Sequence, residues 1–156
     1  MNHIIESGAT IGKNCFIGNY VVIRKGCSIG DNVVIGHNTT LEEDVFVGNG
    51  ARIQANCYLT KGMFIEDNVF IGPSFSSCND MYICSHGRPH KSELIAPTLL
   101  RDCRIGGGVT IGPEVVIGAN AMIGCGSLVL RDVPDGQLWF GHPAKFVKFV
   151  PKDELI

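Results

Sequence analysis

The sequence lacks an excess of charge of either sign, and it lacks long apolar runs. Thirteen Lys and Arg stand against 15 Asp and Glu, a formal net charge of -2, so no basic footprint for nucleic acid or an acidic membrane is present. No apolar run approaches the roughly 20 residues of a membrane span, and the first residues resemble no secretory signal. We therefore expect a cytoplasmic protein without nucleic-acid or membrane partners.

The sequence also lacks a C-x-x-C pair, although it contains seven cysteines. An odd number of thiols without zinc-type spacing fits unpaired cysteines in a reducing compartment. Four of them occupy the small inward positions of the repeat described below, where a free Cys acts as a small hydrophobe: Cys15, Cys27, Cys57 and Cys103. The other three are Cys78, Cys84 and Cys125.

A helical pattern is missing from the first half of the chain, where an aliphatic residue instead occurs at every sixth position. These residues are Ile5, Ile11, Ile17, Ile23, Ile29, Ile35, Leu41, Val47, Ile53, Leu59, Ile65 and Ile71. On an α-helix, at about 100° per residue, such positions would spread over three faces, so a helix is excluded. A second set of mostly small residues lies two positions before these aliphatic residues. Because residues two apart point to the same side of a strand, both sets face inward. This set is Ala9, Cys15, Val21, Cys27, Val33, Thr39, Val45, Ala51, Cys57, Met63 and Val69.

The residues between these short strands are suited to sharp corners. Gly, Asn or Asp follows nearly every aliphatic residue by three positions, and these types tolerate positive φ at low cost; Tyr20 is the exception. Strand and corner alternating at a fixed period are typical of a hexapeptide parallel β-helix.

This pattern resembles the left-handed parallel β-helix of the hexapeptide-repeat acyltransferases, in which three hexads close one triangular coil. The six-residue period stops after Ile71-Gly72-Pro73 and resumes at Leu99. The spacing from Ile71 to Leu99 is not a multiple of six, which indicates an insertion rather than a damaged coil. We therefore predict a single all-β domain with coils over residues 3–77, an inserted loop over 78–97, coils over 98–132 and a C-terminal capping tail over 133–156. Long loops in a regular scaffold are usually functional.

Several residues predicted to point outward are apolar. With 18 residues per coil, Phe46 lies one coil below Phe64, while Val34, Arg52 and Phe70 form a second column. A monomer rarely leaves such patches bare, so they predict a partner surface, most economically in a cyclic homo-oligomer. The resemblance implies a homotrimer with active sites between subunits.

The inserted loop concentrates polar chemistry, including His86 and His90, which can exchange protons near neutral pH. The run from Ile71-Gly72-Pro73 to Asn79 closely resembles nucleotide-linked amino-sugar N-acetyltransferases, and the resemblance implies that Asn79 orients the acceptor amine. His86 or His90 would take the proton. Candidate substrate contacts are Gln54, Asp80 and Arg88. The chain departs from that subgroup in having Cys78 before the Asn and a His-bearing tract after it.

The C-terminal tail also resembles the hexapeptide-repeat acyltransferases. The segment from Gly124 to Pro134, followed by Gly141-His142-Pro143-Ala144-Lys145, resembles the last coil and tail of acyl-CoA-dependent members. Small residues there leave backbone amides accessible to a pantetheine arm, and basic side chains suit its phosphates. The candidate acetyl-CoA contacts are Gly124, Gly126, Arg131, Pro143, Lys145 and Lys148.

Three functions remain open on the sequence. The leading hypothesis is N-acetyltransfer to a nucleotide-linked amino sugar. The second is O-acetyltransfer to a sugar or small alcohol, which would need a loop His as general base. The third is a different class: a γ-carbonic-anhydrase-like zinc protein or a scaffold without activity. A zinc site needs three converging ligands, whereas His37 has Glu42 at the family's offset and His86 lies four residues from His90. We therefore expect no metal.

Overall fold

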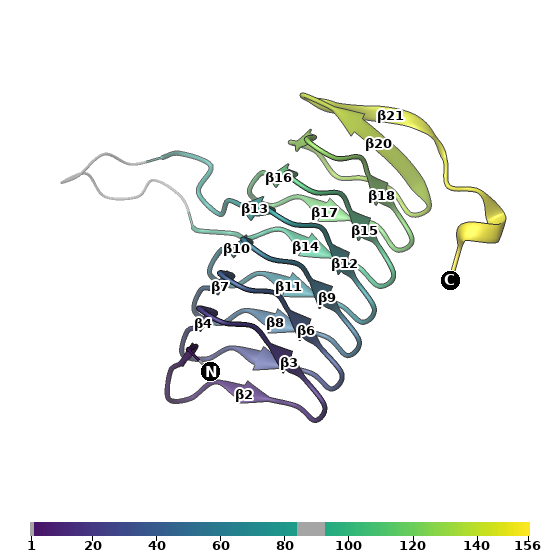
Figure 1. Cartoon of the computed structure of the whole chain (residues 1–156). Helices are drawn as coiled ribbons and strands as arrows, with labels where there is room; N and C mark the ends of the chain where they lie inside the picture. The colour runs from purple at the N-terminus through teal and green to yellow at the C-terminus, as the bar shows by residue number, and fades with distance from the viewer. Residues whose placement is uncertain (1, 84–92) are drawn as a thin grey trace.

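The computed structural model describes residues 2–83 and 93–156, which form a triangular parallel β-solenoid (Figure 1). Very short strands stack into three sheets, one on each face of the prism. Within the described residues the one helical element is a 3-10 turn, η1 (Lys152–Glu154), and no helix is long and apolar enough to cross a membrane. The all-β parallel β-helix predicted from the repeat is confirmed.

The three faces are named by the order in which the chain visits them. The first face contains β1 (Ile4–Ile5), β4 (Val22–Ile23), β7 (Thr40–Leu41), β10 (Tyr58–Leu59), β13 (Ser76–Ser77), β16 (Thr110–Ile111) and β19 (Leu128–Val129). The second contains β2 (Thr10–Ile11), β5 (Ser28–Ile29), β8 (Phe46–Val47), β11 (Phe64–Ile65), β14 (Thr98–Leu99) and β17 (Val116–Ile117). The third contains β3 (Phe16–Ile17), β6 (Val34–Ile35), β9 (Arg52–Ile53), β12 (Phe70–Ile71), β15 (Arg104–Ile105), β18 (Met122–Ile123), β20 (Gln137–Gly141) and β21 (Ala144–Phe149). The first corner joins the first face to the second, the second corner joins the second face to the third, and the third corner joins the third face to the first face of the next coil.

The register between coils shows where the repeat is interrupted. Ile5 pairs with Ile23, 18 residues later, and this spacing recurs up the solenoid. Ile65, however, pairs with Leu99, 34 residues later, so sixteen extra residues leave the solenoid between β13 and β14. They leave at the first corner (Figure 1).

The core is built from the two inward positions of each hexad. From Val21 to Val129 the residues at these positions are buried, and the apolar ones form one continuous cluster. Cys27, Cys57 and Cys103 belong to it, and burial raises the pKa of each thiol. These cysteines therefore act as packing residues, as the repeat predicted.

Close stacking explains the glycines that directly follow the aliphatic residues. A Cβ added at Gly36 would lie 2.5 Å from the backbone nitrogen of Ala55, one coil above. The third residue after nearly every aliphatic adopts positive φ, including Asn14, Asn32 and Asn68. Tyr20 also does so, with φ of 60°, although it is neither Gly, Asn nor Asp.

The coil continues through β13, even though the aliphatic pattern stops at Ile71. Phe75 fills the small inward position, and Ser77 occupies the large one. The Ser77 Oγ accepts a hydrogen bond from the Thr60 amide at 2.9 Å and donates to the Tyr58 carbonyl at 3.3 Å. One coil earlier the equivalent amide, that of Glu42, bonds the Leu59 backbone carbonyl instead. A side-chain hydroxyl thus replaces a ladder carbonyl where the chain departs into the loop.

We predict that Ser77→Ala lowers the free energy of unfolding by about 1–3 kcal/mol, because the buried Thr60 amide loses its acceptor. Hydrogen exchange at the Thr60 amide should accelerate in the same variant. Ser76→Ala, on the outward side of the same strand, is the matched control and should leave that exchange unchanged. Equal behaviour of the two variants in denaturation and exchange would contradict this role.

Candidate functional site

The base of the inserted loop is tied to the solenoid at the first corner. The Ile95 amide donates to the Asn79 carbonyl at 2.9 Å, and the Ile95 carbonyl accepts from the Glu114 amide at 3.0 Å. The two ends of the loop are therefore held together where they leave the coil. This backbone clamp fixes the position of Asn79.

The side chain of Asn79 is also oriented. Its Nδ2 donates to the Lys61 carbonyl of the coil below at 3.5 Å, and the residue is half-buried. Because the amide nitrogen is used in this way, Oδ1 is the end suited to accept a hydrogen bond from a ligand N–H group. Next to it, the Asp80 carboxylate accepts from the Tyr82 amide at 2.9 Å and shapes the first turn of the loop.

His86, Arg88 and His90 lie outside the described residues, as does Cys84. Their candidate roles as proton acceptor and substrate contact therefore stay predictions.

The tail forms a cavity of about 290 Å³ at the end of the solenoid. The hairpin of β20 and β21 extends the third face, because Leu138 and Trp139 pair with Met122 and Ile123. The cavity is lined by Leu130, Arg131, Trp139, Pro143, Ala144, Lys145 and Phe146. It thus brings together three of the six predicted cofactor contacts, Arg131, Pro143 and Lys145.

The other three predicted cofactor contacts lie outside this lining. Lys148 is exposed on β21, where it pairs with Leu138. Gly124 and Gly126 stand at the third corner, and a Cβ on Gly124 would meet the Phe140 ring at 2.4 Å. Nothing lies within 4 Å of a Cβ built on Gly126, so its backbone borders open space.

A second hollow, of about 310 Å³, lies at the loop base. It is lined by Met81, Pro113, Glu114, Val115, Leu130, Arg131 and Asp132. Leu130 and Arg131 line both spaces. The two spaces therefore adjoin at these two residues.

Gln54 and Asn79 lie at different corners of the solenoid within one chain. Gln54 follows β9 at the third corner, whereas Asn79 follows β13 at the first corner. The width of the first face separates them.

A ladder of ion pairs below the loop was missed by the sequence analysis. Arg24 contacts Glu6 at 2.8 Å and Glu42 at 3.5 Å, while Glu43 contacts Lys25 at 3.4 Å and Lys61 at 2.8 Å. Lys61, followed by Lys25, holds the pKa of Glu43 below its ordinary value, and Glu43 raises the pKa of Lys61. The alternation of charge at 18-residue spacing could have revealed this ladder, which supports the coil that holds Asn79.

The described residues contain no group of three or more His, Cys, Asp or Glu placed to hold a metal ion. His37 lies at the third corner, where its Nδ1 accepts from the Asn19 amide at 2.8 Å. Glu42 lies at the first corner beside Arg24. The pair weighed as zinc ligands therefore does not converge in one chain.

Known proteins resemble this chain in both sequence and fold. It is 33% identical over 69 residues to gamma carbonic anhydrase 2 of Arabidopsis thaliana (43% of this chain, 25% of the relative). It is 51% identical over 39 residues to galactoside O-acetyltransferase of Lactococcus lactis (25% of this chain, 19% of the relative). The chain thus spans about a quarter or less of the length of these curated relatives.

Two solved structures share most of the fold. A hexapeptide transferase family protein of Anaplasma phagocytophilum superposes with a TM-score of 0.68 at 24% identity, covering 97% of this chain and 81% of its own. A hexapeptide-repeat acetyltransferase of Vibrio cholerae, solved with acetyl coenzyme A, gives a TM-score of 0.57 at 26% identity, covering 93% and 72%.

The model of the bacterial transferase hexapeptide family (six repeats) matches residues 8–43, 26–61 and 97–131, together more than half of the chain. These matches fall on the coils on either side of the inserted loop. The chain belongs to the bacterial hexapeptide transferase family.

Proposed function

We propose that this protein is an acetyl-CoA-dependent N-acetyltransferase that acts on a nucleotide-linked amino sugar and works as a cytoplasmic homotrimer. The observation that carries the proposal is the meeting of the tail cavity and the loop-base hollow at Leu130 and Arg131. A donor held by the tail and an acceptor held by the loop would meet there. The Vibrio cholerae relative solved with acetyl coenzyme A supports the choice of donor.

The donor would lie along the apolar wall of the tail cavity. Leu130, Trp139 and Phe146 would supply apolar contact for the pantetheine arm, and Lys145 would supply positive charge for the phosphates. Arg131 stands where the tail cavity adjoins the loop-base hollow and would lie near the thioester. The thioester would then face the loop base beside Met81.

The chemistry would be direct transfer without a covalent enzyme intermediate. The uncharged amine attacks the thioester carbonyl, a C–N bond forms, the C–S bond breaks, and CoA leaves as the thiolate. The amine proton passes to a loop His or to that thiolate, so the atoms balance without a metal or redox partner. Asn79 Oδ1 would hold the amine in line with the carbonyl, and such positioning supplies much of the catalysis in bimolecular reactions.

The alternative is O-acetyltransfer to a sugar or small alcohol. The match to a galactoside O-acetyltransferase favours it, as does the His-bearing tract of the loop. A hydroxyl is a poorer nucleophile than an amine, so this reaction would depend on His86 or His90 as general base.

We predict that Lys145→Ala weakens acetyl-CoA binding by roughly tenfold to a hundredfold, because a charge-assisted contact to phosphate is lost. Lys148→Ala is the matched control on the same strand, but it lies outside the cavity lining, and it should change the dissociation constant less than about fivefold. Titration calorimetry measures both. A larger loss in the Lys148 variant would place the donor on the opposite side of the hairpin.

We predict that Asn79→Ala lowers kcat more than His86→Ala or His90→Ala if the acceptor is an amine. Loss of a true general base typically costs about two to four powers of ten, whereas an amine can release its proton late. CoA release should be followed with a panel of nucleotide-linked amino sugars against plain sugars and alcohols. A thousandfold loss in a His variant at unchanged KM, with Asn79→Ala still active, would favour O-acetyltransfer.

A further inference from the structure

The second face of the solenoid exposes a pair of stacked aromatic rings. Phe46 and Phe64 lie in neighbouring coils with ring centroids 4.7 Å apart and an interplanar angle of 10°. Both side chains are exposed, at 39% and 41%. Because the two rings stack face to face between neighbouring coils, the pair presents ring edges outward, an apolar surface along which the methylene stem of an arginine can pack.

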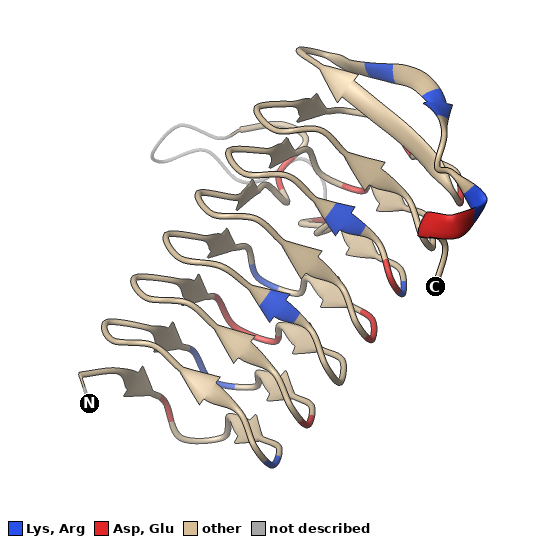
Figure 2. Ribbon diagram, turned by 45° about the vertical axis from the view of Figure 1, so that its right-hand side comes forward, with Lys and Arg blue, Asp and Glu red and all other residues tan. Residues whose placement is uncertain are grey.

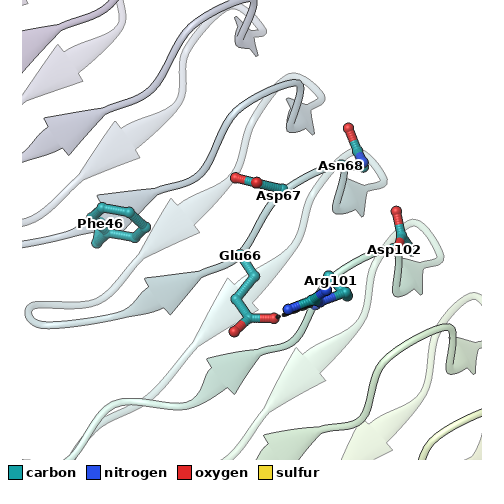
Figure 3. A pocket seen from close by; sticks show the side chains of 6 residues that line it. All are labelled: Phe46, Glu66, Asp67, Asn68, Arg101 and Asp102. Atoms are coloured by element: carbon teal, nitrogen blue, oxygen red, sulfur yellow. Dashed lines mark hydrogen bonds and ion pairs between the residues drawn. The ribbon is translucent and has the colours of Figure 1, made fainter.

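A hollow of about 310 Å³ opens beside these rings, and it is negatively charged (Figure 3). Its lining consists of Phe46, Glu66, Asp67, Asn68, Arg101 and Asp102. Three carboxylates against one guanidinium leave two negative charges in excess.

The charges within the hollow are only partly satisfied. Figure 3 shows Glu66 and Arg101 turned toward each other; the Arg101 backbone amide donates to Glu66 Oε2 at 2.8 Å, but its Nε stands 3.8 Å away. Asp102 is 7% exposed, and its Oδ1 is buried without a hydrogen-bond partner among the described residues. A further cation from outside the chain would therefore improve the local balance of charge.

The third face carries two arginines, Arg52 and Arg104, in one outward column. Arg52 lies in the outward column between Val34 and Phe70, on a face where Figure 2 shows basic strands. Arg104, in the same column, is held by Glu154 at 2.9 Å. In the part of the chain that the structure describes, Arg52 has no such ion pair.

The two surfaces lie at matching heights. Phe46 and Arg52 belong to the same coil, and Phe64, Asp67 and Phe70 to the next, one strand spacing of about 4.8 Å along the axis. A cyclic trimer joins two different patches of the same chain, and with parallel axes equal coils face one another. A dimer would instead need one patch complementary to itself.

We propose that the guanidinium of Arg52 of one copy pairs with the carboxylates of the hollow on the next copy, chiefly Asp67, while its methylene stem packs along the edges of the Phe46–Phe64 pair. This inference rests on the homotrimer proposed above and assigns the faces that form it. The second face of each subunit would pack against the third face of its neighbour.

This arrangement has a consequence for the candidate site. The first corner of one copy, with Asn79, and the third corner of the next, with Gln54 and Gly126, would border the same cleft. Candidate residues that one chain keeps apart would therefore meet between two copies.

The test is the mass in solution, measured by light scattering at micromolar concentration. Arg52→Glu should convert the trimer to monomer, because it places a fourth carboxylate against the hollow. Asp67→Lys should weaken the assembly as well, with at least about a tenfold higher dissociation constant. Because Asp67 Oδ1 also accepts a hydrogen bond from the Asn49 amide at 2.7 Å, Asp67→Asn, which keeps an acceptor and removes only the charge, should weaken the assembly in the same direction.

The double variant R52E/D67K should restore the trimer, because the ion pair is re-formed with reversed polarity. Lys13→Glu is the control for charge reversal at a corner and should remain a trimer. Circular dichroism checks that each variant is folded, and Arg52→Gln, which only removes the charge, replaces R52E if R52E unfolds. A trimeric R52E or R52Q, or a double variant that stays dissociated, would overturn the assignment of the faces. A monomeric wild type would overturn the trimer itself, whereas acetyl-CoA binding tests the proposed function separately.

Discussion

The ladder of backbone hydrogen bonds between coils is the constraint on which the rest of the structure depends. Amide and carbonyl groups pair one coil apart at 2.8–3.0 Å over most of the solenoid, as in Gly36 to Ile53 and Gln54 to Ile71. Such a ladder closes only if every coil has the same length, so each hexad must place small and large residues at the same two inward positions. Insertions are confined to corners, because only there can extra residues leave without breaking the ladder.

The inserted loop shows how this constraint shapes a site. Ser77 keeps the Thr60 amide satisfied while the backbone turns away, and Ile95 joins the loop's return to Asn79 and Glu114. The loop base is thereby held on a rigid frame next to the tail cavity. Leu130 and Arg131, which line both spaces, belong to the last coil. Rigid placement of donor and acceptor is what a direct transfer between two bound molecules requires.

The fold could be predicted from the sequence because its period is strict: inward residues, corner residues and the stacking of Phe46 below Phe64 all follow from counting by six and 18. The site was less accessible to this reasoning. Gln54 and Asn79 resemble one family site in sequence, but they lie one coil and about one hexad apart and therefore at different corners. The ion pairs of Arg24, Glu43 and Lys61 have a sequence signal, the alternation of charge at 18-residue spacing, but counting inward positions does not detect it. The aliphatic pattern also stops before β13, because a polar residue, Ser77, occupies the large inward position there. Lys145 and Lys148 look alike in sequence, yet only Lys145 lines the tail cavity.

The most direct measurement is a crystal structure of the protein with bound CoA. The proposed site predicts the pantetheine arm against Leu130 and Trp139, the phosphates toward Lys145, and the thiol at the junction with the loop base beside Met81. Electron density for CoA in that orientation, within reach of Asn79, would support acetyl transfer at this place. Density for CoA on another part of the solenoid, with the thiol remote from the loop base, would contradict it.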